Sequence, residues 1–213
     1  MPIRLKISWK YKLWLLLALV SCSPAPVVDY GFGEYYVEIV TALGEDAFLL
    51  DNGQTIYDSH KTAKKSFDAG DRVFLYFSYG NNPSDPITVH RASKIFSDTL
   101  RTVSEDAMPQ QADDPIRLES AWIGSHYLNL RFYFEFHSKP HRISLMMDET
   151  QVDDSEIHLY FLHDRNNDNP GYPTLVYASY DLSNLLRVPQ GDRVLFVHFN
   201  TSNYGNKTCI FKY

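Results

Sequence analysis

Cysteine is nearly absent from this chain of 213 residues, which has two, Cys22 and Cys209. A disulfide framework is therefore excluded, and the fold must be stabilised by packing. Long apolar runs are also scarce. The most apolar segment, Leu13 to Val20, has eight residues, whereas a helix that crosses a bilayer needs about 20. The sequence thus predicts no membrane-spanning helix.

The compact motifs of common hydrolases are also missing. The sequence contains no G-x-S-x-G and no H-E-x-x-H, which mark serine hydrolases and zinc proteases. Catalytic triads can also be assembled from distant positions, so a missing motif lowers the expectation of an enzyme without removing it. We predict a non-enzymatic protein and assign no catalytic residue and no cofactor.

The N-terminus combines a basic stretch, a short apolar run and a cysteine. Four basic residues and no acidic residue precede Cys22, and the apolar run leads into Leu19-Val20-Ser21-Cys22. This order of charge and apolarity is typical of a signal peptide, and the last four residues resemble a lipobox, in which cleavage occurs before a lipidated cysteine. We predict a signal peptide over residues 1–21, palmitate or a similar lipid on Cys22, and a tether over residues 22–33.

Cleavage would leave an acidic protein. Without residues 1–21 the chain has 16 basic and 26 acidic residues, a net charge of −10. An acidic body repels phosphate backbones, so nucleic acid is not expected as a partner. The expected partners are the membrane, through the lipid on Cys22, and another envelope protein or a glycan.

The location follows from the tether. Surface export of such lipoproteins favours acidic residues soon after the lipidated cysteine, and here the first one is Asp29. We therefore expect a lipid-anchored protein of the bacterial outer membrane that faces the periplasm.

Residues 34–103 have the pattern of a small barrel. Short apolar runs recur through this region, and Asp51-Asn52-Gly53 between two of them is a strong hairpin signal. About five strands in some 65 residues match a barrel of the OB type. Residues 104–115 are rich in Asp, Gln and Pro, which predicts an interdomain linker.

Residues 116–213 have the pattern of a β-sandwich. From His126 to His137 the even positions are mainly apolar and the odd ones mainly polar, which predicts one long strand with a core face and an outer face. About seven such strands in this region predict an antiparallel sandwich and an all-β protein. Cys209 lies in a strand-like run, where it is best interpreted as a small buried side chain.

The outer face of the long strand is a candidate ligand site. Tyrosines can stack on sugar rings, and neighbouring amides and charges can bond hydroxyl groups. The alternative is an ordinary solvated sheet face with cross-strand pairs. The candidate ligand residues are Tyr127, Arg131, Tyr133 and Glu135.

No metal site is assigned, although two segments contain suitable ligands. Asp164, Asn166 and Asp168 resemble the first half of an EF-hand loop, but Leu175 stands where the bidentate glutamate belongs. Asn and Asp also fill ordinary turns. His137 and His141 have the spacing of zinc ligands on a helix, but Lys139-Pro140 interrupts the chain between them.

The chain resembles the NigD-like lipoproteins of Bacteroidetes. The resemblance spans nearly the whole mature chain and is strongest in its second half. It implies an N-terminal OB domain, a C-terminal β-sandwich and an envelope location, and it supplies no catalytic residues. It rests on Trp122, Tyr127-Leu128-Asn129-Leu130, Lys139-Pro140-His141, Leu162-His163-Asp164 and Tyr180-Asp181-Leu182-Ser183-Asn184-Leu185.

Two functional hypotheses follow. The first is a non-enzymatic, membrane-tethered binding or assembly protein of the cell envelope. The second is a glycan-binding or weakly glycan-active protein that uses the outer face of the strand 126–137. They differ in whether that face is open or covered by the first domain.

Overall fold

A computed structural model gives the fold of the protein. It describes residues 35–44, 46–59, 67–80, 85–104, 111–151, 155–186 and 193–212. The predicted signal peptide, Cys22 and the tether lie outside these residues. Within the described segments, no helix is long and apolar enough to cross a bilayer.

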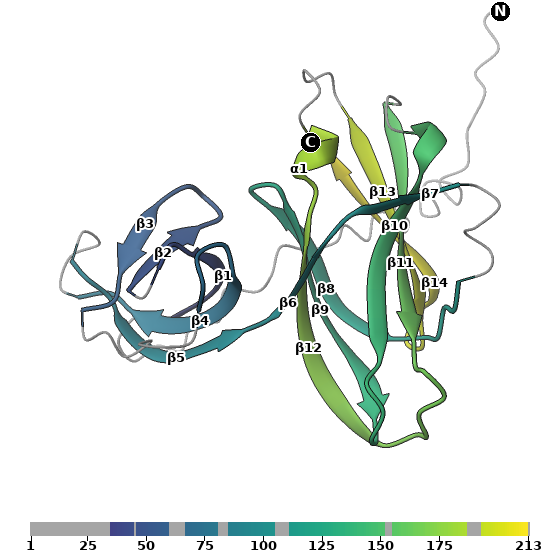
Figure 1. Ribbon diagram of the computed structural model, residues 1–213, viewed down its shortest axis with the longest axis horizontal. Coiled ribbons are helices and arrows are strands. Elements are labelled where there is room, and N and C mark those ends of the chain that lie inside the picture. The colour runs from purple at the N-terminus through teal and green to yellow at the C-terminus, as the bar shows by residue number, and fades with distance from the viewer. Residues whose placement is uncertain are drawn as a thin grey trace, which may run out of the picture.

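The N-terminal domain is a curled five-stranded sheet (Figure 1). Its strands are β1 (Tyr35–Ala42), β2 (Ala47–Leu50), β3 (Thr55–Tyr57), β4 (Arg72–Ser78) and β5 (Thr88–Lys94). Their order is β3-β2-β1-β4-β5, and a parallel bridge between Asp58 and Ile87 joins the two edges. The predicted OB-like barrel is confirmed in strand number and closes only through this bridge.

Local sequence explains how this sheet forms. The predicted hairpin at Asn52-Gly53 joins β2 to β3, with Gly53 at φ 88°, a value that glycine adopts at little cost. Alternate residues of each strand turn inward and form a small core around Phe48, Leu75 and Phe77, each at most 1% exposed. The barrel therefore has a hydrophobic core of its own.

The C-terminal domain is a sandwich of two mixed sheets. One has the order β14-β13-β11-β10-β7 and the other β6-β12-β9-β8. The elements are β6 (Phe96–Thr99), β7 (Arg101–Val103), β8 (Arg117–Gly124), β9 (Tyr127–Phe136), β10 (Arg142–Asp148), η3 (Glu149–Gln151), β11 (Glu156–Asp164), β12 (Tyr172–Asp181), α1 (Ser183–Leu186), β13 (Val194–Thr201) and β14 (Gly205–Lys212).

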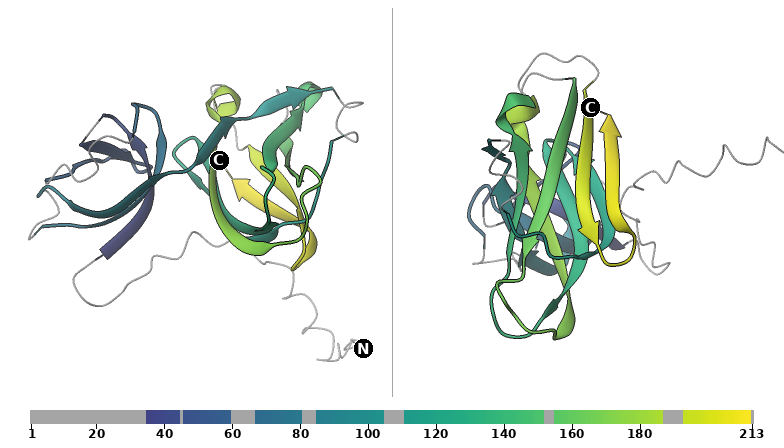
Figure 2. Two further views of the ribbon diagram at one scale, coloured as in Figure 1. Left: turned by 60° about the horizontal axis from the view of Figure 1, so that its bottom comes forward. Right: turned by 90° about the vertical axis from the view of Figure 1, so that its right-hand side faces the viewer.

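The prediction of a sandwich is confirmed, but the pairing is not purely antiparallel. The pairs β10–β7, β11–β13 and β12–β6 are parallel. β13 and β14 form a hairpin along one side of the sandwich (Figure 2). Local periodicity sets which residues face the core, but it contains no information on strand direction, so the parallel pairs could not be predicted.

The strand predicted over residues 126–137 is β9, and its apolar positions form the centre of the core. Leu128, Leu130 and Phe132 are fully buried. Cys209 on β14 belongs to the same core and is 1% exposed, which confirms its predicted burial. Period-2 alternation thus identified the core face of this strand.

The predicted domain boundary needs correction. The chain leaves the barrel after β5, and β6 and β7 already belong to the two sheets of the sandwich. Figure 1 shows this crossing strand, residues 96–103, running over the side of the sandwich. Only residues 104 and 111–115 of the predicted linker are described, and Asp114 donates its backbone N–H to the carbonyl of His163 at 2.7 Å. The described residues of this segment therefore belong to the sandwich and do not connect the two domains.

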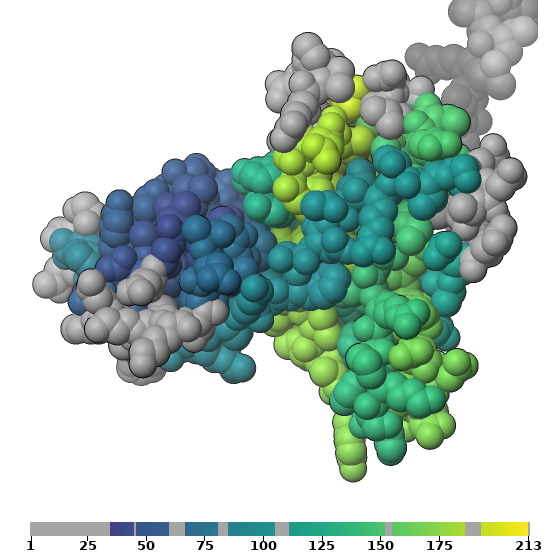
Figure 3. All heavy atoms as spheres, viewed as in Figure 1, coloured from purple at the N-terminus to yellow at the C-terminus, as the bar shows by residue number. Residues whose placement is uncertain are grey.

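Arg72 joins the two domains. Its guanidinium is 1% exposed and forms an ion pair with Asp51 at 2.8 Å. From the sandwich, Asn129 accepts a hydrogen bond from Nη2 at 3.1 Å, and Ser179 accepts one from Nε at 3.0 Å. Asn129 also donates to Asp51 at 3.0 Å. We call these four side chains the interdomain node; in Figure 3 the barrel and the sandwich meet as two lobes in direct contact.

Candidate binding site

The first domain covers the beginning of the predicted ligand face on β9. The guanidinium of Arg72 lies 3.9 Å from the ring centre of Tyr127, and Asn129 is fully buried in the interdomain node. The glycan hypothesis required an open face. Tyr127 is therefore placed as a contact between domains and not as an open stacking platform.

In the remaining part of this face, Tyr133 has a cross-strand contact. The guanidinium of Arg117 lies 4.1 Å from the ring centre of Tyr133 and donates to Glu119. Arg131 buries its Nε without a partner among the described residues. Tyr133 and Glu135 line a hollow of about 330 Å³. This arrangement is that of an outer sheet face with cross-strand pairs.

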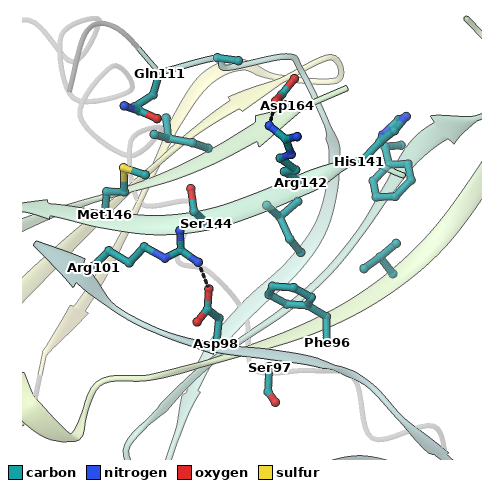
Figure 4. Close-up of a pocket in the computed structure, with 15 residues that line it drawn as sticks. Phe96, Ser97, Asp98, Arg101, Gln111, His141, Arg142, Ser144, Met146 and Asp164 are labelled. Carbon is teal, nitrogen blue, oxygen red and sulfur yellow. Dashed lines mark hydrogen bonds and ion pairs between the residues drawn. The ribbon is translucent and has the colours of Figure 1, made fainter. Parts of the chain in front are cut away.

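A larger cavity, of about 540 Å³, opens on the side of the sandwich beneath the crossing strand (Figure 4). No local sequence pattern indicates it, because its walls come from strands far apart in the chain. We call it the side cavity. It is lined by Phe96, Ser97, Asp98, Arg101, Gln111, Ala112, Phe134, His141, Arg142, Ile143, Ser144, Met146, Leu162, Asp164 and Val176.

The charged groups of the side cavity are paired with one another. Arg101 donates to Asp98 at 2.7 Å, and Arg142 lies 3.8 Å from Asp164. Figure 4 shows these pairs on opposite parts of the rim. Phe134 and Val176 contribute apolar surface between them. Such a lining can hold a ligand that has both apolar and polar groups.

His141 lines the same cavity and is engaged through both ring nitrogens. Its side chain is 2% exposed. Nδ1 lies 2.9 Å from Nε2 of His163, and Nε2 lies 3.3 Å from Oδ2 of Asp168. His163 in turn bonds the carbonyl of Asp114 through Nδ1 at 3.2 Å. The four groups form one chain of hydrogen bonds beside the ring of Phe134.

Two members of this chain have fixed roles. The carbonyl of Asp114 accepts only, so His163 donates to it from Nδ1. Asp168 also receives hydrogen bonds from the backbone N–H groups of His137 and Ser138. Although burial opposes it, these bonds hold the pKa of Asp168 far below its usual value. An ionised carboxylate accepts only, so any hydrogen bond between Asp168 and His141 is donated by Nε2 of the imidazole.

The residues that resemble a calcium loop form a turn in the structure. Oδ1 of Asp164 accepts the backbone N–H of Asn166 at 2.7 Å, while Asn166 and Asn167 have left-handed backbone, φ 55° and 54°. Asp168 points instead to His141 and to the backbone at His137. Local hydrogen bonds therefore account for these side chains.

The described residues give no evidence for a metal site around His137, His141 or the turn at Asp164–Asp168. Across the described residues, no group of three or more His, Cys, Asp or Glu side chains is placed to hold a metal ion. His137 bonds Ser138, whereas His141 bonds His163 and Asp168. The two histidines that had the spacing of zinc ligands thus have different partners.

Stability should fall when the pH drops below about 6.5. Burial, with the nearby charge of His141, lowers the pKa of His163 from its ordinary value of 6.5, and burial beside His158 lowers that of His198. Below pH 6.5 the unfolded chain therefore binds more protons than the folded one, so the free energy of unfolding decreases as pH falls. Denaturant unfolding at about pH 7.5 and about pH 5.5 measures this.

The control for the pH dependence uses two variants. His163→Gln should reduce the difference between the two pH values. His126→Gln, at a histidine whose side chain is 41% exposed, should leave it unchanged. Equal pH dependence in the parent and in His163→Gln would contradict the assignment.

Comparison with known proteins places the chain in a family. The family model of the NigD-like C-terminal beta sandwich domain matches residues 99–213, more than half of the chain. The chain therefore belongs to the NigD-like family, as the sequence resemblance indicated. The match begins within the crossing strand, which agrees with the corrected boundary. Among curated proteins, none matches the chain.

Solved structures share both halves of the fold. A protein of unknown function from Bacteroides vulgatus has a TM-score of 0.71 at 20% identity, over 84% of this chain and 90% of that one. A NigD-like immunity protein from Bacteroides caccae has a TM-score of 0.67 at 17% identity, over 86% and 98%. A protein from Bacteroides fragilis, named provisionally as a lipoprotein, has a TM-score of 0.59 at 14% identity, over 84% and 96%. At these identities the likeness concerns the fold.

Proposed function

We propose that this protein is a lipid-anchored, non-enzymatic binding protein of the bacterial cell envelope, held on the periplasmic side of the outer membrane. The side cavity carries the proposal of a binding role. Its carboxylates are paired with arginines, and its histidine is held through both nitrogens. These groups can orient a ligand. Because they already bond to other side chains, they are better suited to binding than to proton transfer.

The interdomain node supports the same role. A buried arginine with partners in both domains fixes how the barrel and the sandwich sit together. A surface that is rigid before binding loses less conformational entropy when a partner docks. The expected partner is another protein of the envelope.

The basic N-terminus, its short apolar run and the lipobox-like residues up to Cys22 support the anchor. Cys22→Ala should abolish incorporation of labelled palmitate and move the protein from the membrane pellet to the soluble fraction after the cells are broken. The reason is that the variant lacks the residue that would carry the acyl chains, and these chains together hold the protein on the bilayer. Palmitate labelling and fractionation of the parent and variant measure this.

Two outcomes contradict the anchor. One is a variant that takes up palmitate and sediments with membranes as well as the parent does. The other is a disulfide between Cys22 and Cys209 in the intact protein, because a thiol that carries lipid is not available to form one. Intact mass of the purified protein detects both the lipid and the disulfide.

The binding role is tested by capture from detergent-solubilised envelopes with the tagged full chain. A specific envelope protein should be retained by the parent and lost in a competition with excess untagged protein. Capture of nothing beyond the proteins that bind an untagged control resin contradicts the binding role.

A further inference from the structure

Among the described residues, the crossing strand leaves part of each sheet edge without a neighbouring strand. β7 pairs with Met146–Asp148 of β10, and β6 pairs with Ala178–Asp181 of β12. The other halves of these two strands, residues 142–145 and 172–177, thus lack a described strand on that side. The side cavity lies between them, because Ile143 and Val176 both line it.

The backbone of Ile143 faces this open edge. In an antiparallel pair of strands, the N–H and C=O of one residue point to the same side. Two directly opposite residues either both point these groups toward each other or both point them away. Ile143 lies opposite His163 of β11. The C=O of His163 accepts from Asp114, which lies on the side of β13, since Asn200 bonds Asp113 next to it. His163 therefore turns its backbone away from β10, and Ile143 turns its own away from β11.

The two edges differ in their capacity to pair. Pro173, in the open half of β12, has no N–H to donate to an added strand. Residues 142–145 of β10 contain no proline. An added strand would therefore pair with β10, in line with β7. In the part of the chain that the structure describes, the position in line with β7 is free because Leu100 connects β7 to β6, which belongs to the other sheet.

We propose that the open edge of β10 accepts an extended peptide segment of a partner protein, which completes this sheet in line with β7. This inference rests on the proposed binding role and names the chemistry of the partner. The segment bonds the backbone of Ile143 and places an apolar side chain between Phe134 and Val176. Its neighbouring polar residues meet the charges of Arg101 and Arg142 on the rim. Backbone pairing with side-chain pockets at alternate positions is a general mode of peptide recognition.

The probe is a phage-displayed library of twelve-residue peptides, selected against the detergent-solubilised full chain. Selected peptides should alternate apolar and polar residues. In the parent protein, a selected peptide should slow hydrogen exchange at the amide of Ile143 and leave the exchange of β14, at the other edge of the sheet, unchanged.

Two variants of one residue test the backbone pairing. Ile143→Pro removes the outward N–H and should weaken binding of the selected peptide by roughly tenfold or more. Ile143→Val keeps that N–H and should bind as the parent does. Should Ile143→Pro fail to fold, Ser144→Trp, which fills the side cavity from the surface of β10, should weaken binding to a similar degree.

The inference is overturned when no alternating peptide is selected, when protection maps elsewhere, or when Ile143→Pro or Ser144→Trp folds and binds as the parent does. The proposed function fails separately, when the tagged chain captures no envelope protein. If the Ile143→Pro variant still captures the envelope partner, the binding role is supported and this site is rejected.

Discussion

Arg72→Met is expected to lower the free energy of unfolding by about 3 kcal/mol, because it leaves the carboxylate of Asp51 and the amide of Asn129 without their main partner. Arg72 is 1% exposed, and its Asp51 partner is 19% exposed. Methionine has a similar length and fills much of the space. The loss therefore reports the broken ion pair and hydrogen bonds more than a cavity. Urea unfolding of parent and variant measures it.

In the same variant, the two domains should also unfold in separate transitions. The node bonds β4 of the barrel to β9 and β12 of the sandwich. Each domain has a core of its own, so loss of the node should replace one calorimetric transition with two. Arg101→Met is the matched control, because its pair with Asp98 is 56% and 25% exposed and should contribute less than about 1 kcal/mol. Similar losses in both variants, with one transition in each, would show that the node does not couple the domains.

The class of fold could be predicted from the sequence, because local patterns determine it. Alternation in β9 identified Leu128, Leu130 and Phe132 as core residues, and Asn52-Gly53 identified a hairpin. The alternation also placed Asn129 on an outer face, which is correct for its sheet. No local pattern indicates that the barrel packs on this face and buries Asn129 fully.

The node and the side cavity could not be predicted, for the same reason. Arg72 is the first residue of β4, a position where a polar residue is common, so the local sequence does not indicate its burial. Its partners lie 21, 57 and 107 residues away. Residues 96–103 form two strands of only four and three residues, too short for alternation to assign them to a sheet. The error in the domain boundary and the missed cavity both come from this crossing strand.

Gly171→Ala is expected to destabilise the protein by roughly 2–3 kcal/mol through a backbone clash. A Cβ at this position would lie 2.1 Å from the carbonyl oxygen of Phe136 and 2.9 Å from Cα of His137. Both are backbone atoms at the end of β9, so the strand end has to move. Thermal unfolding of parent and variant measures the loss, and Gly53→Ala, whose Cβ meets no atom within 4 Å, should cost only about 1 kcal/mol for its positive φ.

The clash should also disturb the side cavity, because the displaced backbone holds the buried carboxylate. His137 donates its N–H to Asp168 at 2.8 Å, and Asp168 bonds His141. Movement at His137 should therefore shift the imidazole resonances of His141 and His163 in NMR spectra. Those of His158 and His198, whose rings stack on each other, should stay in place. Unchanged resonances at His141 in a destabilised Gly171→Ala protein would show that this hydrogen-bond chain is independent of the strand end.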